Sequence, residues 1–210
     1  MTSPLDPIVP FCFDAGEPEA QLATLRQIRR DYGIRRFLVT APGSGVHLTG
    51  YPDTDVYRKI GTTIKEINDR LAGDDILAGW WCAPSLRSGN ASYQHITAPS
   101  GMPRPYAMCP LDRDFAADLA EKVARVAAIA RPFMIQFEDD FELSDFSNAG
   151  CFCPAHLELF AARTGRFRSR EELAELFATV APESIALRRE WAAMSRDTLA
   201  GFAARIRAGV

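Results

Sequence analysis

The order of apolar and amphipathic segments constrains the fold of this chain more than any other feature. Four short apolar runs, each typical of a buried strand, alternate with three segments whose apolar residues recur at helical spacing. The expected strands are residues 8–13, 37–40, 75–82 and a run that begins at residue 133. The expected helices are residues 17–32, 56–71 and 111–130. This alternation predicts an α/β fold in which βα units build a parallel sheet.

From residue 154 onward the pattern is entirely helical, with one helix at about 154–163 and another at about 182–206. Between them, Ser169 followed by Glu172 carries the sequence signature of a capping box at a helix start. The helical segment of the chain is thus expected at about 154–208.

Long loops follow the third and fourth expected strands, which suits a TIM-barrel-like fold whose active site lies at the carboxyl ends of its strands. Such barrels need eight strands and typically about 250 residues. With four expected strands in 210 residues, we expect a single domain, residues 1–210, that is the N-terminal part of a half or truncated (β/α) barrel.

Composition excludes several classes of protein. A net charge of -3, with 24 basic and 27 acidic residues and no basic block, argues against a nucleic-acid partner. The sequence has neither a basic, apolar leader nor a long apolar run, so we expect no signal peptide, no membrane partner and a cytoplasmic location. Five cysteines, an odd number, fit a reduced compartment and a metal site better than a disulfide framework.

The fourth expected strand ends in three adjacent carboxylates, Glu138, Asp139 and Asp140. The carboxyl ends of strands are where α/β folds place their chemistry. Neighbouring acids repel one another, so a fold that keeps them gains from a shifted pKa or a bound cation. One reading is therefore acid/base chemistry, and another is a hard divalent ion in a metal-dependent lyase or hydrolase. A solvated acidic turn is the alternative without a function.

A cluster of thiols and an imidazole follows this strand. Cys151, Cys153 and His156 lie within six residues and offer the sulfur and nitrogen ligands that zinc prefers. Cys109, which ends the third loop and precedes the helix leading to the fourth strand, is the best candidate for a fourth ligand. Four protein ligands would make a closed, structural zinc site that pins the two loops together. The alternative is a set of unrelated cysteines and a surface histidine.

These motifs carry a family resemblance. Residues 136–140 (QFEDD), 151–160 (CFCPAHLELF) and 170–173 (REEL) resemble the zinc-containing β-galactosidases of glycoside hydrolase family 42 and their (β/α)8-barrel relatives. The similarity covers roughly residues 101–176. It implies zinc on the four residues named above, with His156 in the place of the family's third clustered cysteine.

The resemblance also implies a retaining O-glycosidase that acts on carbohydrate. Asp140 would be the general acid/base, with Glu138 and Asp139 as candidates one or two residues out of register, and Arg104 and Tyr106 would contact the sugar. Such an enzyme needs a second carboxylate about 5–5.5 Å from the first. In the family that nucleophile lies on a late strand, so none is assigned in this sequence. The rival expectation is a non-catalytic carbohydrate-binding or scaffolding half-barrel that acts as a homo-oligomer, a dimer.

Three weaker candidates for carbohydrate contacts follow the first and third strands. Trp80 and Trp81 end the third strand, and because adjacent strand residues face opposite ways, one of them should face the barrel mouth. The alternative is that both pack in the core. Asp14 follows the first strand and would bond a sugar hydroxyl or cap the next helix, and we favour the cap.

Overall fold

A computed structural model describes residues 5–40, 52–82, 85–86, 92–137, 141–143 and 150–210. The chain falls into two compact units. The first unit takes residues 1–85 and 121–140 with residue 210, and the second takes residues 86–120 and 141–209. Helix α3 (Arg113–Ala130) contributes its first turns to the second unit and its remaining turns to the first.

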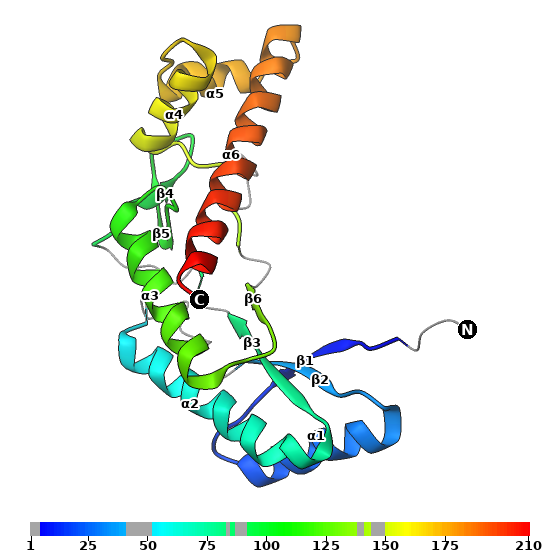
Figure 1. The fold of residues 1–210 in the computed structure, drawn as a ribbon. Coiled ribbons are helices and arrows are strands. Elements are labelled where there is room, and N and C mark those ends of the chain that lie inside the picture. Colours follow the sequence, from blue (N-terminus) through cyan, green and yellow to red (C-terminus); the bar gives the residue numbers. More distant parts are fainter. Residues whose placement is uncertain (1–4, 41–51, 83–84, 87–91, 138–140, 144–149) are drawn as a thin grey trace. The chain divides into compact units, whose positions relative to one another are not determined.

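The first unit is built on a parallel sheet of four strands (Figure 1). The strands are β1 (Ile8–Cys12), β2 (Arg36–Thr40), β3 (Leu77–Cys82) and β6 (Ile135–Phe137), in the spatial order β1-β2-β3-β6. Every neighbouring pair is parallel, because each strand is joined to the next by a connection that contains a helix. The predicted α/β class and the predicted parallel sheet of four strands are confirmed.

Two helices of this unit follow the sequence pattern closely. Helix α1 (Pro18–Tyr32) ends where Gly33 takes a left-handed conformation with φ 73°. Helix α2 (Thr54–Leu71) starts at Asp53, whose side chain accepts a hydrogen bond from the backbone N–H of Val56 at 3.0 Å, and a 3-10 turn, η2 (Ala72–Asp74), follows it. The buried face of α2, which packs against β3, is made of Tyr57, Ile60, Gly61, Ile64, Ile67 and Leu71. This periodicity of 3 and 4 residues is the amphipathic stripe that predicted the helix.

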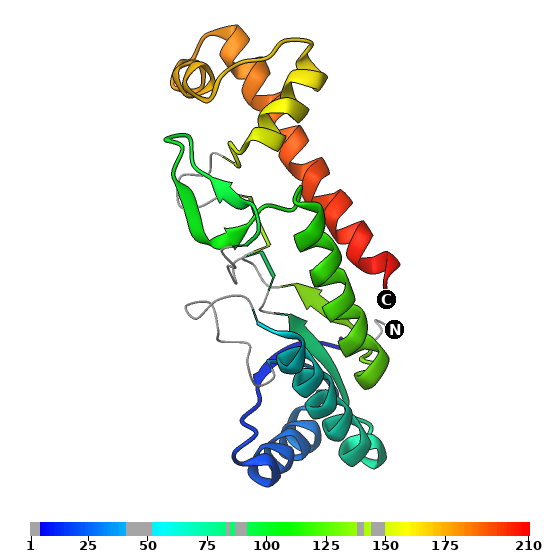
Figure 2. The ribbon, with the colours of Figure 1, turned by 90° about the vertical axis from the view of Figure 1, so that its left-hand side faces the viewer.

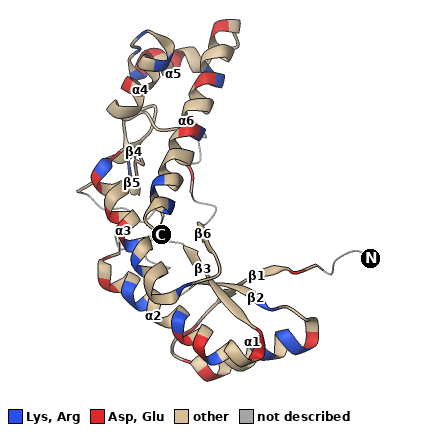
Figure 3. Ribbon diagram, in the orientation of Figure 1, with Lys and Arg blue, Asp and Glu red and all other residues tan. Residues whose placement is uncertain are grey.

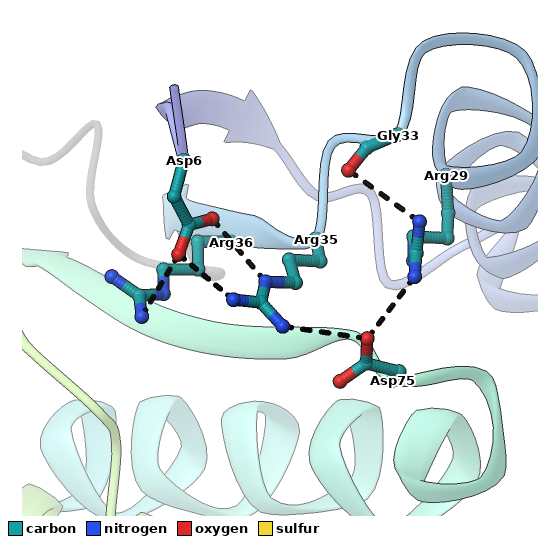
Figure 4. Close-up of polar contacts among 6 residues, drawn as sticks. All are labelled: Asp6, Arg29, Gly33, Arg35, Arg36 and Asp75. Atoms are coloured by element: carbon teal, nitrogen blue, oxygen red, sulfur yellow. Dashed lines mark hydrogen bonds and ion pairs between the residues drawn. The ribbon is translucent and has the colours of Figure 1, made fainter. Parts of the chain in front are cut away.

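The amino-terminal edge of this sheet carries a network of ion pairs (Figure 4). Asp6, just before β1, pairs with Arg35 at 3.1 Å and with Arg36 at 3.0 Å. Asp75, just before β3, pairs with Arg29 at 3.1 Å and with Arg35 at 3.6 Å. The network thus ties together the segments that lead into three adjacent strands.

A small antiparallel hairpin in the second unit corrects the sequence analysis, which expected an irregular loop over residues 83–110. Strands β4 (His95–Thr97) and β5 (Pro103–Met108) pair with each other alone (Figure 2). Strand β5 contains Pro103 and Pro105, which cannot donate to a ladder, but a two-stranded sheet has free edges where proline is tolerated. Gly101, at φ 89°, closes the turn.

The rest of the second unit is helical, as predicted. It contains α4 (Pro154–Thr164), α5 (Arg170–Phe177) and α6 (Pro182–Ala208). The predicted capping box is present, since Ser169 accepts from the N–H of Glu172 and the Glu172 carboxylate accepts from the N–H of Ser169. The core shared by these helices consists of Phe152, Leu157, Phe160, Leu173, Leu187, Trp191 and Met194.

Charged side chains are distributed over all the described helices, while β3 and β6 carry none (Figure 3). Among the described residues, no helix is both long enough and apolar enough to span a bilayer.

Candidate metal centre

The second unit brings together all four metal ligands that the sequence nominated. Cys109 directly follows β5, Cys151 and Cys153 precede α4, and His156 lies in the first turn of α4. Their ligand atoms all lie within 4.8 Å of one another, and all four residues are fully buried. They are close enough to hold a metal ion.

The separations among three of the four ligand atoms match those of a tetrahedral site. The Sγ atoms of Cys109 and Cys153 are 3.6 Å apart, and Nδ1 of His156 is 3.5 Å from the first and 3.3 Å from the second. Zinc bonds of about 2.3 Å to sulfur and about 2.0 Å to nitrogen at tetrahedral angles place two sulfurs about 3.8 Å apart and sulfur and nitrogen about 3.5 Å apart. The donor set and its size therefore fit zinc.

The start of helix α4 explains how Cys153 and His156 meet. Cys153 is the N-cap residue in an extended conformation, and Pro154 occupies the first helical position, where its missing N–H is not needed. The backbone N–H of His156 donates to the carbonyl oxygen of Cys153 at 3.0 Å. One helical turn thus separates the two residues, which directs their side chains to the same side.

The hairpin holds the other half of the site. The N–H of Cys109 donates to the carbonyl oxygen of Gln94 at 2.7 Å, and the N–H of Phe152 donates to the carbonyl oxygen of Thr97 at 2.8 Å. In turn, the N–H of Thr97 donates to Sγ of Cys151 at 3.5 Å. Backbone hydrogen bonds from the β4 segment therefore reach both halves of the cluster.

Apolar side chains surround the thiols, and burial together with thiol–thiol contacts shifts their pKa values. Hydrogen bonds to Cys151 and Cys153, followed by burial, raise the pKa of Cys109 far above its ordinary value. The hydrogen bond with Cys109 lowers the pKa of Cys151, but the bond with Cys153 and burial outweigh it and raise that pKa to about 12. Hydrogen bonds from Cys109 and Cys151 lower the pKa of Cys153.

In the absence of metal, these directions favour one thiolate among the three thiols, at Cys153, with Cys109 and Cys151 protonated. A bound dication would remove the repulsion that keeps those two protons in place. The Nε2 atom of His156 is buried and has no hydrogen-bond partner in the part of the chain that the structure describes. The imidazole is therefore positioned by the contacts of Nδ1 with the thiols of Cys109 and Cys153 and by packing.

The candidate carbohydrate contacts are divided between the units. Arg104 and Tyr106 share strand β5, where Arg104 is half-buried and Tyr106 is 45% exposed. Trp80 is fully buried in the first unit, edge-on to Tyr57 with ring centroids 6.1 Å apart, while Trp81 keeps part of its surface exposed. The three acids Glu138, Asp139 and Asp140 lie outside the described residues.

Asp14 does not cap the helix that follows it, so the cap favoured by the sequence is wrong. The residue at the N-cap of α1 is Glu17, and its side chain makes no capping hydrogen bond. Oδ1 of Asp14 instead accepts from the N–H of Gly16 at 2.7 Å. A carboxylate that bonds the backbone two residues on stabilises a tight turn.

Two residues next to the metal ligands were not singled out from the sequence. Gly150 precedes Cys151 with φ 83°, and Arg170 reaches the carbonyl oxygen of Phe152 from α5. A glycine directly before a C-x-C pair is a sequence signal that could have identified Gly150. Nothing in the local sequence distinguishes Arg170 from its neighbouring arginines.

No protein-family model matches this chain, and no curated protein is significantly similar to it. What can be said of its function therefore starts from the geometry of the site.

Proposed function

We propose that Cys109, Cys151, Cys153 and His156 bind one structural zinc ion. The observation that carries the proposal is the convergence of three thiols and an imidazole, all fully buried, with their ligand atoms within 4.8 Å of one another. Catalytic zinc sites keep one position for water or substrate, whereas this site offers four protein ligands and no exposed side chain. The role of the ion is to fasten the β4–β5 hairpin to the start of α4.

Metal analysis tests this directly. The purified protein should hold one zinc per chain, and Cys109→Ser, Cys151→Ser or Cys153→Ser should each lower zinc affinity by orders of magnitude. Cys12→Ser is the matched control, because Cys12 is exposed and lies outside the cluster. A chain that takes up no zinc after reduction, or a Cys12 variant that loses it equally, would rule the site out.

For the activity of the whole protein we propose a glycoside hydrolase of the β-galactosidase type, a retaining O-glycosidase on a TIM-barrel-like fold. Two features support it. The strands follow one another in spatial order, as in a barrel, instead of reversing as in a doubly wound sheet. The three acids directly follow Phe137, the last residue of β6, in the sequence.

In this proposal Asp140, or its neighbours Glu138 and Asp139, supplies the general acid/base. Arg104 and Tyr106 contact the sugar, and zinc fixes β5, on which both stand. The test is hydrolysis of an aryl β-galactoside by the protein from its native source. Turnover that Asp140→Asn, Glu138→Gln and Asp139→Asn all leave unchanged would exclude this role.

The second candidate is a non-catalytic carbohydrate-binding or scaffolding protein that acts as a dimer. The observation that favours it is the exposed surface of Tyr106 on β5, an aromatic ring of the kind that stacks on sugars. A protein that binds galactosides without hydrolysing them, and sediments as a dimer, would establish it over the hydrolase.

A further inference from the structure

Arg170 contacts the metal centre from outside its ligand shell. It is the first residue of α5, and its Nε donates to the carbonyl oxygen of Phe152 at 3.3 Å. Phe152 stands between the ligands Cys151 and Cys153. The guanidinium therefore bonds the one peptide carbonyl that links the middle of the C-x-C pair to its second cysteine.

The same guanidinium packs against the turn of the hairpin. The turn is closed by hydrogen bonds from the N–H of Gly101 to the oxygen of Ala98 and from the N–H of Ala98 to the oxygen of Met102, both 2.9 Å. A Cβ atom on Gly101 would lie 2.8 Å from Nη1 of Arg170, so a side chain at this position would force the end of the arginine to move. The φ of 89° at Gly101 also favours glycine.

The peptide groups around Phe152 are thus held from two directions. The N–H donates to Thr97 of strand β4 at 2.8 Å, and the C=O accepts from Arg170. Thr97 also donates to Sγ of Cys151. Arg170 therefore completes a frame of hydrogen bonds around the C-x-C segment that includes both the hairpin and α5.

Charge favours the same arrangement. Three thiolates, a neutral imidazole and Zn²⁺ carry one net negative charge in a fully buried site, and isolated buried charge is costly. A guanidinium that donates to the backbone beside the thiolates offsets part of that charge. Outer-shell partners of this kind orient the ligands and tune the metal.

We infer that Arg170 is a positioning residue of the metal centre, which raises zinc affinity by fixing the Cys151–Cys153 segment against the hairpin turn. The inference rests on the proposed zinc site. It adds a residue that touches neither the metal nor its ligand side chains.

The experiment compares zinc affinity of the full chain and its variants by competition with a chromophoric chelator. Arg170→Gln should bind zinc about 10–100-fold more weakly than the parent protein. Arg170→Lys, which restores the charge without the guanidinium fork, should recover part of the loss. Arg166→Gln, an exposed arginine on the loop before α5, is the matched control and should leave the affinity unchanged.

A substitution at Gly101, in the hairpin turn, is a second test of the contact with Arg170. Gly101→Ala should weaken zinc binding, while Gly165→Ala, which also has a positive φ but open space around its Cα, should not. Cobalt substitution gives a readout that general loss of stability would not change. The sulfur-to-cobalt charge-transfer bands should keep their intensity per bound ion in every variant, because the ligands stay the same.

The outcomes separate this inference from the proposed function. If the parent protein binds no zinc, both are wrong. If the parent binds zinc and a folded Arg170→Gln protein binds it within twofold as tightly, the zinc site stands and the role of Arg170 is refuted. Equal losses in Arg166→Gln and Arg170→Gln would also refute it, since the effect would then be one of surface charge.

Discussion

Gly150 lies so close to the indole of Trp191 that a Cβ atom on it would sit 2.6 Å from Nε1. The same Cβ would be 3.3 Å from Oγ of Ser195, on the same helix. Because Gly150 immediately precedes Cys151, the chain can enter the metal centre along this path only if the residue has no side chain.

Gly150→Ala should therefore weaken zinc binding and destabilise the second unit. Gly165→Ala is the control for the effect of backbone conformation alone, because Gly165 has a φ of 70° and nothing lies within 4 Å of its Cβ position. This substitution should lower the unfolding free energy by about 1–2 kcal/mol and leave the zinc affinity unchanged. Gly150→Ala should lower the unfolding free energy by more than this, as measured by urea unfolding of the zinc-bound protein.

A double-mutant cycle with Trp191→Phe checks the cause. Phenylalanine lacks the pyrrole ring that carries Nε1, so the double variant should lose less stability than the sum of the two single losses, by about 0.5–3 kcal/mol. Strict additivity would show that the indole is not what excludes a side chain at residue 150.

Helix and strand positions were readable from the sequence because they depend on local periodicity. The apolar spacing of α2 and the capping box at Ser169 act within a few residues, and both were predicted. The four metal ligands were predictable because zinc chemistry restricts the residue types, although Cys109 lies 42 positions before Cys151 (151 − 109).

The features that could not be predicted from the sequence depend on contacts between residues far apart in the chain. The β4–β5 hairpin is held by the turn at Gly101 and by backbone hydrogen bonds to residues 109 and 152. Arg170 and Trp191 act on residues 18 and 41 positions away (170 − 152 and 191 − 150), where no local rule applies. Asp14 was misassigned because a turn and a helix cap use the same carboxylate chemistry.

Zinc binding should release about two protons per ion near neutral pH. The raised pKa of Cys109 and the pKa of about 12 for Cys151 favour protonated thiols in the metal-free protein, whereas the lowered pKa of Cys153 favours its thiolate. Zinc takes only thiolates, so affinity should rise about a hundredfold per pH unit between about pH 7 and pH 8.5 and fall as the pH is lowered. Calorimetry in buffers of different ionisation enthalpy counts the protons, and a value near zero or three would contradict this charge distribution.

Trp80 and Trp81 should respond differently to truncation, although they are neighbours on β3. Trp80 is fully buried against Tyr57, so Trp80→Ala should cost about 3–5 kcal/mol of unfolding free energy. Trp81 is partly exposed, so Trp81→Ala should cost less and should weaken galactoside binding if the proposed activity is right. Urea unfolding and sugar titration of both variants measure the two effects. Equal losses of stability with no change in sugar binding would place both rings in the core.

The ion pairs at the amino-terminal edge of the first sheet should make a small contribution to stability that depends on pH and salt. The hydrogen bond from Arg35, helped by the charges of Arg35 and Arg36, lowers the pKa of Asp6. A carboxylate whose folded pKa is depressed stabilises the fold above its unfolded value, about 3.9, and loses that effect as pH falls through the folded pKa.

Asp6→Asn should therefore lower the urea midpoint slightly at pH 7 and low salt. The difference from the parent protein should shrink in 1 M NaCl, because exposed pairs are screened. It should shrink further as the pH falls below the unfolded value of about 3.9 and vanish once the pH has passed the depressed folded pKa of Asp6. Asp31→Asn, an exposed aspartate near the end of α1, controls for the loss of one negative charge and should lower the midpoint at none of these conditions. A deficit in Asp6→Asn that persists at low pH would mean that the side chain acts through neutral hydrogen bonds to the two arginines, and not through charge.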